Sequence, residues 1–184
     1  MSTVVLTGKV RLSYCSLFEA KAPQGGGDPK YSVTLLLPKS DTVTLEKMKD
    51  AIAEAREAFC NRHGANALPL KPNHTLKDGD GVRDNGDPFG PECKGHYVIT
   101  VSSKLKPAVF DAFGNETNDP NEVYSGVYAR AKINFYGYNV NGKKGISAGL
   151  LGVKKLHDGQ PFGLSCSADD FNDGYTDGDD DDIM

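Results

Sequence analysis

Hydrophobic and polar residues alternate in two short segments near the N-terminus, which is the pattern of half-buried β-strands. The first runs from Val4 to Leu12, and the apolar side chains expected on its buried face are Val4, Leu6, Val10 and Leu12. The polar side of the same segment carries Thr7, Lys9, Arg11 and Ser13. After a loop with Pro23 and three glycines, alternation resumes from Lys30 to Leu37 and ends at Pro38. The pattern predicts two strands.

The spacing changes after residue 40. Apolar residues recur every three or four positions from Leu45 to Phe59, Ser40 to Thr42 offer N-cap oxygens, and Gly64 follows the stripe. These signals predict one amphipathic helix. Residues 64–95 are rich in Pro, Gly, Asn and Asp and have no apolar periodicity, so we expect a long loop there.

Strand-like segments dominate the second half of the chain. They are His96 to Ser103, Ala108 to Asp111, Val123 to Val140 and Lys143 to Leu156. Asn141-Gly142 between the last two is a strong signal for a β-hairpin turn, and Gly126 or Gly137 suits a bulge in the long strand. The predicted fold class is therefore mostly β with one main helix (α+β).

The long segment 123–140 has one apolar side and one aromatic and basic side. The aromatic and basic positions are Tyr124, Tyr128, Arg130, Lys132, Tyr136 and Tyr138. Alternate side chains of a strand lie on one face, and water seldom favours four tyrosines on an exposed face. Single-stranded nucleic acid would explain them, because unpaired bases stack on aromatic rings and cations follow the phosphates. The alternative is that the tyrosines pack under the helix or loop, or form cross-strand pairs.

Further cations could form a basic rim around this face. They lie on the polar side of the first strand or near later strand ends, and are Lys9, Arg11, Lys104, Lys106, Lys154 and Lys155.

Charge divides the chain into two parts. Eight of its 25 acidic residues are aspartates after residue 168, where no Lys or Arg occurs, which leaves 17 acids against 21 bases in the rest. We expect a folded domain over residues 1–164 and a disordered acidic tail over 165–184. The tip of this tail joins four acids to two apolar residues, as Asp179, Asp180, Asp181, Asp182, Ile183 and Met184. Such a tip suits docking to a partner protein.

Four segments resemble one protein family: Lys94-Gly95-His96-Tyr97, Tyr124-Ser125-Gly126-Val127-Tyr128-Ala129-Arg130, Phe135-Tyr136-Gly137-Tyr138 and Gly145-Ile146-Ser147-Ala148-Gly149-Leu150. They are similar to a phage and prophage family of single-stranded DNA-binding proteins of OB fold, over most of residues 1–160 and the tail. The resemblance implies a five- to six-stranded OB-type barrel and single-stranded DNA binding without sequence preference. It further implies a role in phage DNA replication or recombination, with the acidic tail recruiting replication or recombination proteins in the cytoplasm of the bacterial host.

Other functions find less support in the sequence. Cys60, His63, Cys93 and His96 form two Cys-x-x-His pairs that could bind zinc, although buried thiols and ordinary histidines explain the same letters. We find no nucleophile elbow, phosphate loop or His-Glu-x-x-His motif, so we expect neither an enzyme nor a cofactor. No apolar run is long enough to span a membrane, and we expect no membrane partner.

A second hypothesis belongs to a different class. The chain could be an acidic scaffold or DNA-mimic protein whose tyrosine-rich face binds another protein, because aromatic residues are also enriched at protein interfaces. The oligomeric state, a homodimer included, stays open at this point.

Overall fold

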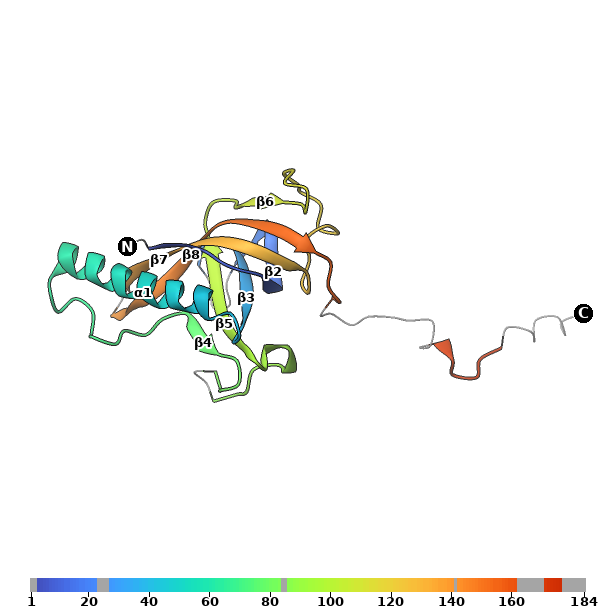
Figure 1. Cartoon of the computed structure of the whole chain (residues 1–184), viewed down its shortest axis with the longest axis horizontal. Helices are drawn as coiled ribbons and strands as arrows, with labels where there is room; N and C mark the ends of the chain where they lie inside the picture. Colours follow the sequence, from blue (N-terminus) through green and yellow to red (C-terminus); the bar gives the residue numbers. More distant parts are fainter. Residues whose placement is uncertain (1–2, 23–26, 84–85, 141, 162–170, 177–184) are drawn as a thin grey trace, which may run out of the picture.

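The computed structural model describes residues 3–22, 27–83, 86–140, 142–161 and 171–176 (Figure 1). Its elements, in chain order, are β1 (Val4–Leu6), β2 (Val10–Lys21), β3 (Lys30–Pro38), α1 (Thr42–His63), β4 (Leu76–Asp78), the short 3₁₀ helix η1 (Pro91–Cys93), β5 (His96–Ser103), β6 (Ala108–Phe110), β7 (Tyr128–Val140) and β8 (Lys143–His157). None of these helices has the length and apolar character needed to cross a membrane.

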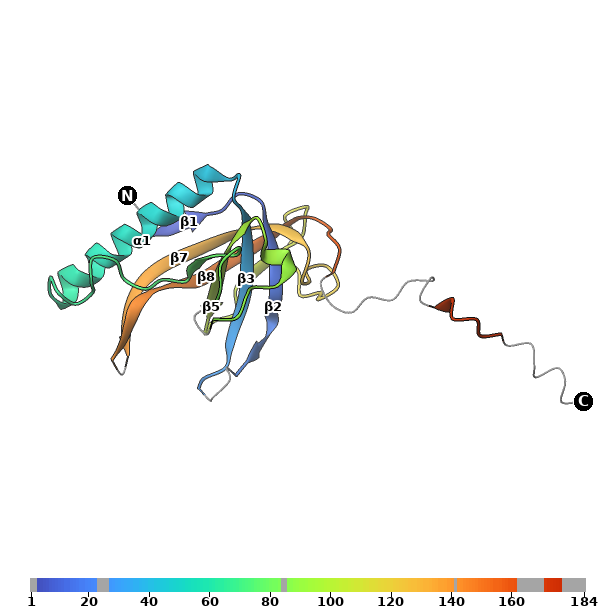
Figure 2. The same cartoon turned by 90° about the horizontal axis from the view of Figure 1, so that it is seen from below.

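Five strands close into a ring in the order β2, β3, β5, β8, β7 and back to β2. All neighbours in the ring are antiparallel except β5 and β8, which pair in parallel. A five-stranded Greek-key barrel of this kind is the OB fold, so the predicted fold class is confirmed. The β2–β3 and β7–β8 hairpins project on the same side of the barrel (Figure 2).

The first predicted strand is wrong in one respect. The chain breaks near Gly8 into β1 and β2, and β1 pairs with residues 132–134 in the middle of β7. The break changes which side chains point inward: Val5 is buried, whereas Val4 and Leu6 are 39% and 50% exposed. Thr7, expected on the polar side, is buried, and its hydroxyl accepts a hydrogen bond from the Ala131 amide.

The helix forms as predicted and covers one side of the barrel. The Asp41 side chain caps its first turn by accepting a hydrogen bond from the Thr44 amide at 3.0 Å. Its apolar stripe packs against β7 and β1, where Gly137 leaves room for the Phe59 ring: a Cβ on Gly137 would lie 2.6 Å from Phe59 Cγ. The barrel interior and the buried side of α1 form one continuous core.

Residues 64–95 hold more structure than predicted. They contain β4 and η1, and β4 pairs with β5 through Leu76 and Ile99. Just before β4, His74 bridges to Ile146 of β8. Segment 73–78 therefore lies where β5 and β8 separate and joins both strands. A three-residue strand has too few positions to produce an alternating pattern, which is why the sequence did not reveal it.

Candidate nucleic-acid interface

Strand β7 has the predicted alternation from Tyr128 onward. Ala129, Ala131, Ile133 and Phe135 are buried in the core, while alternate residues point out of the barrel. The strand begins later than predicted because Gly126 has a φ of +116°, a conformation that interrupts extended backbone.

Tyr124 consequently lies outside the strand and has a local role. Its hydroxyl is 2.9 Å from Asp158 Oδ1 and 3.0 Å from the Gly159 carbonyl oxygen, either of which can accept its proton. Burial and the bond to Asp158 raise the pKa of this hydroxyl. Tyr124 thus fastens the chain after β8 to the barrel and does not join the outer face of β7.

A basic cluster surrounds Tyr128 at the start of β7. Lys9 Nζ and the Arg11 guanidinium lie 5.5 Å and 5.4 Å from the centre of its ring, and the His157 ring lies 4.7 Å away. Arg130 is next on the outer face, opposite Lys154 of β8. This Tyr128 cluster brings together five of the predicted residues, Lys9, Arg11, Tyr128, Arg130 and Lys154.

Lys155 is not part of the basic rim. Its side chain is 6% exposed and makes ion pairs with Glu122 at 3.0 Å and Asp158 at 2.7 Å. The cause is a bulge: Ile133 pairs with Leu150 and Lys132 with Gly152, so Leu151 is an extra residue in β8. The extra residue reverses the inward and outward positions that follow, and Lys155 turns inward.

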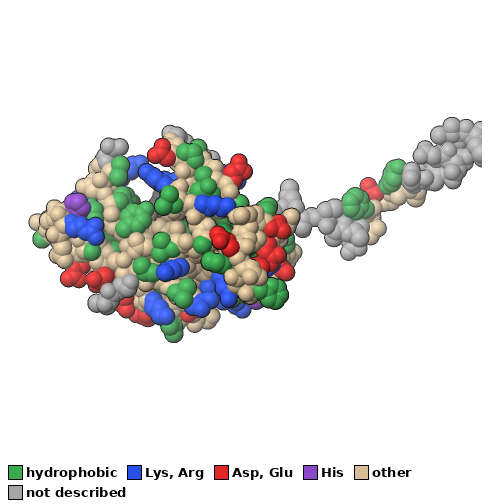
Figure 3. Space-filling view, turned by 90° about the horizontal axis from the view of Figure 1, so that it is seen from above, with side chains coloured by type: hydrophobic (Ala, Val, Ile, Leu, Met, Phe, Trp, Pro, Cys, Tyr) green, Lys and Arg blue, Asp and Glu red, His purple; other side chains and the backbone are tan. Residues whose placement is uncertain are grey.

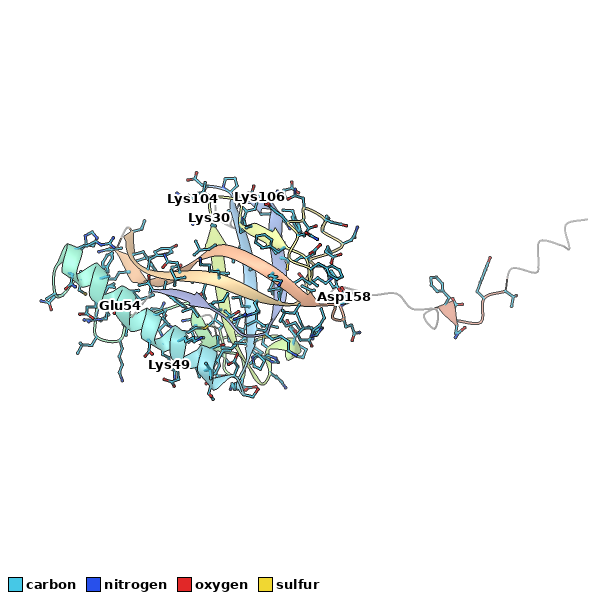
Figure 4. The ribbon with its side chains drawn as sticks, turned by 45° about the horizontal axis from the view of Figure 1, so that its top comes forward. Lys30, Lys49, Glu54, Lys104, Lys106 and Asp158 are labelled. Atoms are coloured by element: carbon cyan, nitrogen blue, oxygen red, sulfur yellow. The ribbon has the colours of Figure 1, made fainter. Side chains whose placement is uncertain are left out.

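Lys104 and Lys106 lie beyond the end of β5, near Lys30 at the start of β3 (Figure 4). Lys104 is exposed and 3.7 Å from the Asp28 carboxylate, and Lys106 donates a hydrogen bond to Asn118. These two lysines therefore border the side of the barrel on which the β2–β3 hairpin projects.

Tyr136 and Tyr138, the remaining predicted tyrosines, lie about 26 Å or more along β7 from Tyr128. They line a hollow of about 470 Å³ with Lys30, Asn73, His74, Thr75, Lys77, Val140, Ile146 and Ser147. Nδ1 of His74 is buried there and has no hydrogen-bond partner among the described residues. Burial and the nearby Lys77 ammonium lower the pKa of this imidazole.

Small residues form the floor beside Tyr136. Ser147 pairs with Tyr136, and Gly149 pairs with both Asn134 of β7 and Ser102 of β5. On the far side of Ser102 is Ser32 of β3. Side chains of this size leave the outer surface of the barrel hollow between the two projecting hairpins.

A second hollow of about 670 Å³ continues from this floor. Its lining is Tyr14, Cys15, Ser16, Lys21, Ala22, Lys30, Ser32, Ser102 and Ser125, so Lys30 borders both hollows. We call the two together the outer groove. It crosses the outer faces of β7, β8, β5, β3 and β2, with Tyr136 near one end and Tyr14 near the other.

The electrostatic character of the outer groove is positive. Lys21, Lys30 and Lys77 line it, and no described Asp or Glu does. In the view of Figure 3, Lys and Arg side chains are spread over the middle of the body, while most Asp and Glu lie nearer its margins. Sequence reasoning missed Tyr14, Lys21 and Lys30, because only the register of the closed barrel brings them into the same groove as Tyr136.

The comparison with protein families decides the assignment. A model of the single-stranded DNA-binding protein of Enterobacter phage Enc34 matches residues 3–184. The chain belongs to this family. The resemblance seen in the sequence is thereby confirmed. Protein p50 of Acyrthosiphon pisum secondary endosymbiont phage 1 is 35% identical over 172 residues, covering 89% of this chain and 90% of that protein.

Two solved structures are similar to this chain over most of its length. The bacteriophage Enc34 protein in complex with single-stranded DNA has 33% identity and a TM-score of 0.72, covering 88% of this chain and 90% of that one. Bacteriophage T7 gp2.5 has 13% identity and a TM-score of 0.60 over 89% of this chain and 97% of its own, which shows a shared fold. The Enc34 protein is described as a single-stranded DNA-binding protein, in agreement with the prediction that the chain is not an enzyme.

Two groups of predicted residues need separate mention. The four residues of the zinc hypothesis do not form a site in the described structure: Cys60 lies in the main core and Cys93 in a small cluster with Leu36 and Val98. The tail residues Asp179, Asp180, Asp181, Asp182, Ile183 and Met184 lie outside the described residues, although the family match includes them.

Proposed function

We propose that this protein binds single-stranded DNA along the outer groove, with little sequence preference, during phage DNA replication or recombination. The observation that carries the proposal is the groove itself, which places tyrosines and lysines around a floor of small residues, with no carboxylate among the described residues that line it. Rings can stack on any base, and ammonium groups attract any phosphate, so such a groove has no means to read one sequence. Solved relatives in the same family bind single-stranded DNA.

The groove favours a single strand over a duplex. Stacking on Tyr136 requires a base whose faces are free, and in a duplex both faces are covered by neighbouring pairs. The Tyr128 cluster lies outside the groove and supplies further positive charge, through which the strand would continue around the barrel.

We also propose that the acidic tail recruits replication or recombination proteins. Its aspartates would steer it to a basic surface, and Ile183 and Met184 would anchor it in an apolar pocket. The same aspartates, tethered beside a positive groove, would compete with DNA phosphates for the lysines.

The test is a comparison of labelled oligo(dT), a mixed-sequence single strand, the matching duplex and RNA, each at low and high salt, by fluorescence anisotropy. We expect similar affinities for the two single strands, weaker duplex binding, and an affinity that falls as salt rises, with a slope of about 0.7 per phosphate contact. A Lys21→Ala, Lys30→Ala double variant should reduce that slope by about 1.4. Lys49→Ala on α1 is the matched control, because this exposed lysine lies away from the groove (Figure 4).

Equal affinity for duplex and single strand, or binding that salt does not weaken, would contradict the proposal. Such a result would favour the protein-binding scaffold as the function of the tyrosine-rich face.

A further inference from the structure

Tyr14 combines two unusual properties. Among the described residues it is the only one other than glycine with a positive φ, at +50°, and its side chain is 67% exposed. Left-handed backbone is unfavourable for a residue with a Cβ, and an exposed tyrosine gains little from burial to offset it. The surrounding structure must therefore hold Tyr14 in this conformation.

A β-bulge imposes the conformation. Ser13 pairs with Thr34 and Ser16 with Ser32, so Tyr14 and Cys15 of β2 face a single residue of β3. The Cys15 amide donates a hydrogen bond to Ser125 Oγ at 3.1 Å. Cys15 also packs against the core, where burial raises the pKa of its thiol to about 11. Ser13 is buried and Cys15 packs partly against the core, whereas Tyr14 between them is exposed.

Tyr14 lines a hollow whose other polar residues match a nucleotide. The hollow that it lines also presents the hydroxyls of Ser16, Ser32, Ser102 and Ser125 and the ammonium groups of Lys21 and Lys30. An aromatic ring offers a stacking surface for a base, hydroxyls can bond to sugar and phosphate oxygens, and ammonium groups neutralise the phosphates. No described carboxylate lines the hollow to repel them.

The position of Tyr14 extends the groove to a second stacking point. From Tyr136 on β7 the groove crosses β8, β5 and β3 to reach β2, which is four strand spacings or about 19 Å. The floor between the two tyrosines is formed by Gly149, Ser102 and Ser32. These small residues leave room for single-stranded DNA to lie across them. Two rings at opposite ends would hold different bases of one strand.

We propose that Tyr14 is a base-stacking residue and that its hollow is a nucleotide subsite, separate from the one beside Tyr136 and Tyr138. The inference rests on the proposed function, since it assigns the second end of the same groove. The bulge serves to present the ring before DNA arrives, so that binding does not have to order it.

The backbone conformation itself gives a sharp test. Tyr14→Gly removes the ring and at the same time relieves the left-handed conformation, so this variant should unfold at the same or a higher denaturant concentration than wild type. Its affinity for oligo(dT) should nevertheless fall about 5- to 150-fold, the range for loss of one stacked base. Tyr14→Phe keeps the ring and should bind within about threefold of wild type. A Tyr14→Gly variant that binds oligo(dT) as tightly as wild type would overturn the proposal.

A fluorescence reporter separates this proposal from the function on which it rests. The chain has no tryptophan, so Tyr14→Trp introduces a single indole into the hollow. Oligo(dT) should quench its emission, whereas it should leave the emission of a Phe113→Trp control unchanged, because Phe113 is 90% exposed in the loop after β6 and lines neither hollow. If wild type fails to bind oligo(dT), the proposed function is wrong; if it binds and both indoles stay unquenched, only the role of Tyr14 is wrong.

Discussion

The Tyr136 ring of β7 lies over Gly149 of β8. A Cβ built on Gly149 would be 3.6 Å from Tyr136 Cε1, an ordinary van der Waals contact. It would be 3.8 Å from the Ser102 carbonyl oxygen of β5 on its other side. The absence of a side chain at position 149 therefore keeps the floor of the outer groove low between Tyr136 and Ser102.

Filling this point should block the groove without unfolding the protein. Gly149→Ala makes only ordinary contacts and should bind single-stranded DNA nearly as wild type does. Gly149→Leu projects a side chain over the floor and should reduce the affinity for oligo(dT) about tenfold or more, about 1.4 kcal/mol, by anisotropy. The thermal midpoint of both variants should stay close to that of wild type.

Gly145 provides the contrast for this experiment. A Cβ there would lie 2.5 Å from the Asn73 carbonyl oxygen, so Gly145→Ala should destabilise the barrel itself. Wild-type affinity in Gly149→Leu would show that DNA does not cross β8 at this position.

The two ends of β7 should respond differently to loss of a tyrosine. Tyr136→Ala should weaken single-strand binding by about 1–3 kcal/mol with little effect on folding, because its ring is 43% exposed in the groove. Tyr128→Ala should affect stability as well, because Lys9, Arg11 and His157 all pack on that ring. Titration with oligo(dT) and urea unfolding of the same samples measure both effects. Identical behaviour of the two variants would count against a groove that includes Tyr136 and excludes Tyr128.

The sequence predicted these elements unequally, for physical reasons. The regular alternation of β3 and the apolar stripe of α1 are local patterns, and both elements appear close to the expected residues. The inward turn of Lys155 was not predictable, because it depends on one extra residue in β8, Leu151, relative to β7. Tyr14 escaped notice for the same reason, since a bulge is a property of two paired strands and leaves no period in either one.

Truncation of the tail should separate competition from recruitment. Deletion of residues 169–184 removes eight aspartates and should strengthen single-strand binding, most strongly at low salt, where ions screen the tail least. The measurement is oligo(dT) affinity of full-length and truncated protein across a salt series. Unchanged affinity at low salt would mean that the aspartates do not compete with DNA.

Removal of Ile183 and Met184 alone should have another effect. All the aspartates remain, so DNA affinity should hardly change, whereas pull-down of a phage or host replication protein should be reduced because the apolar anchor is lost. If the shortened protein still binds every partner, the two apolar residues have no role in recruitment and the tail acts through its charge alone.

The network that holds the end of β8 should be sensitive to acid. Hydrogen bonds from Lys155 and Tyr124 lower the pKa of Asp158 below its usual value near 3.8. A carboxyl whose pKa is lower in the folded than in the unfolded protein stabilises the fold above the unfolded pKa, and this contribution is lost as the pH falls through the folded pKa. Asp158→Asn should therefore be less stable than wild type at pH 6, and the difference should shrink below about pH 4.

Urea midpoints of both proteins across this pH range provide the measurement. Asp28→Asn is the control, because the Asp28 to Lys104 ion pair is exposed and long at 3.7 Å, and its loss should change little. A constant difference between wild type and Asp158→Asn from pH 6 to pH 3 would contradict the role given to this carboxylate.

Among the described residues, β5 and β8 pair directly only at Ser102 and Gly149, and segment 73–78 bridges the gap beyond them. This is the seam of the barrel, and local opening begins where the fewest backbone hydrogen bonds must break. The outer groove runs across the same seam. Single-stranded DNA bound in it would therefore hold β5 and β8 together where they pair least. Amide hydrogen exchange at the seam should then slow as DNA occupies the groove. The rate of local opening would therefore report how much of the groove is filled.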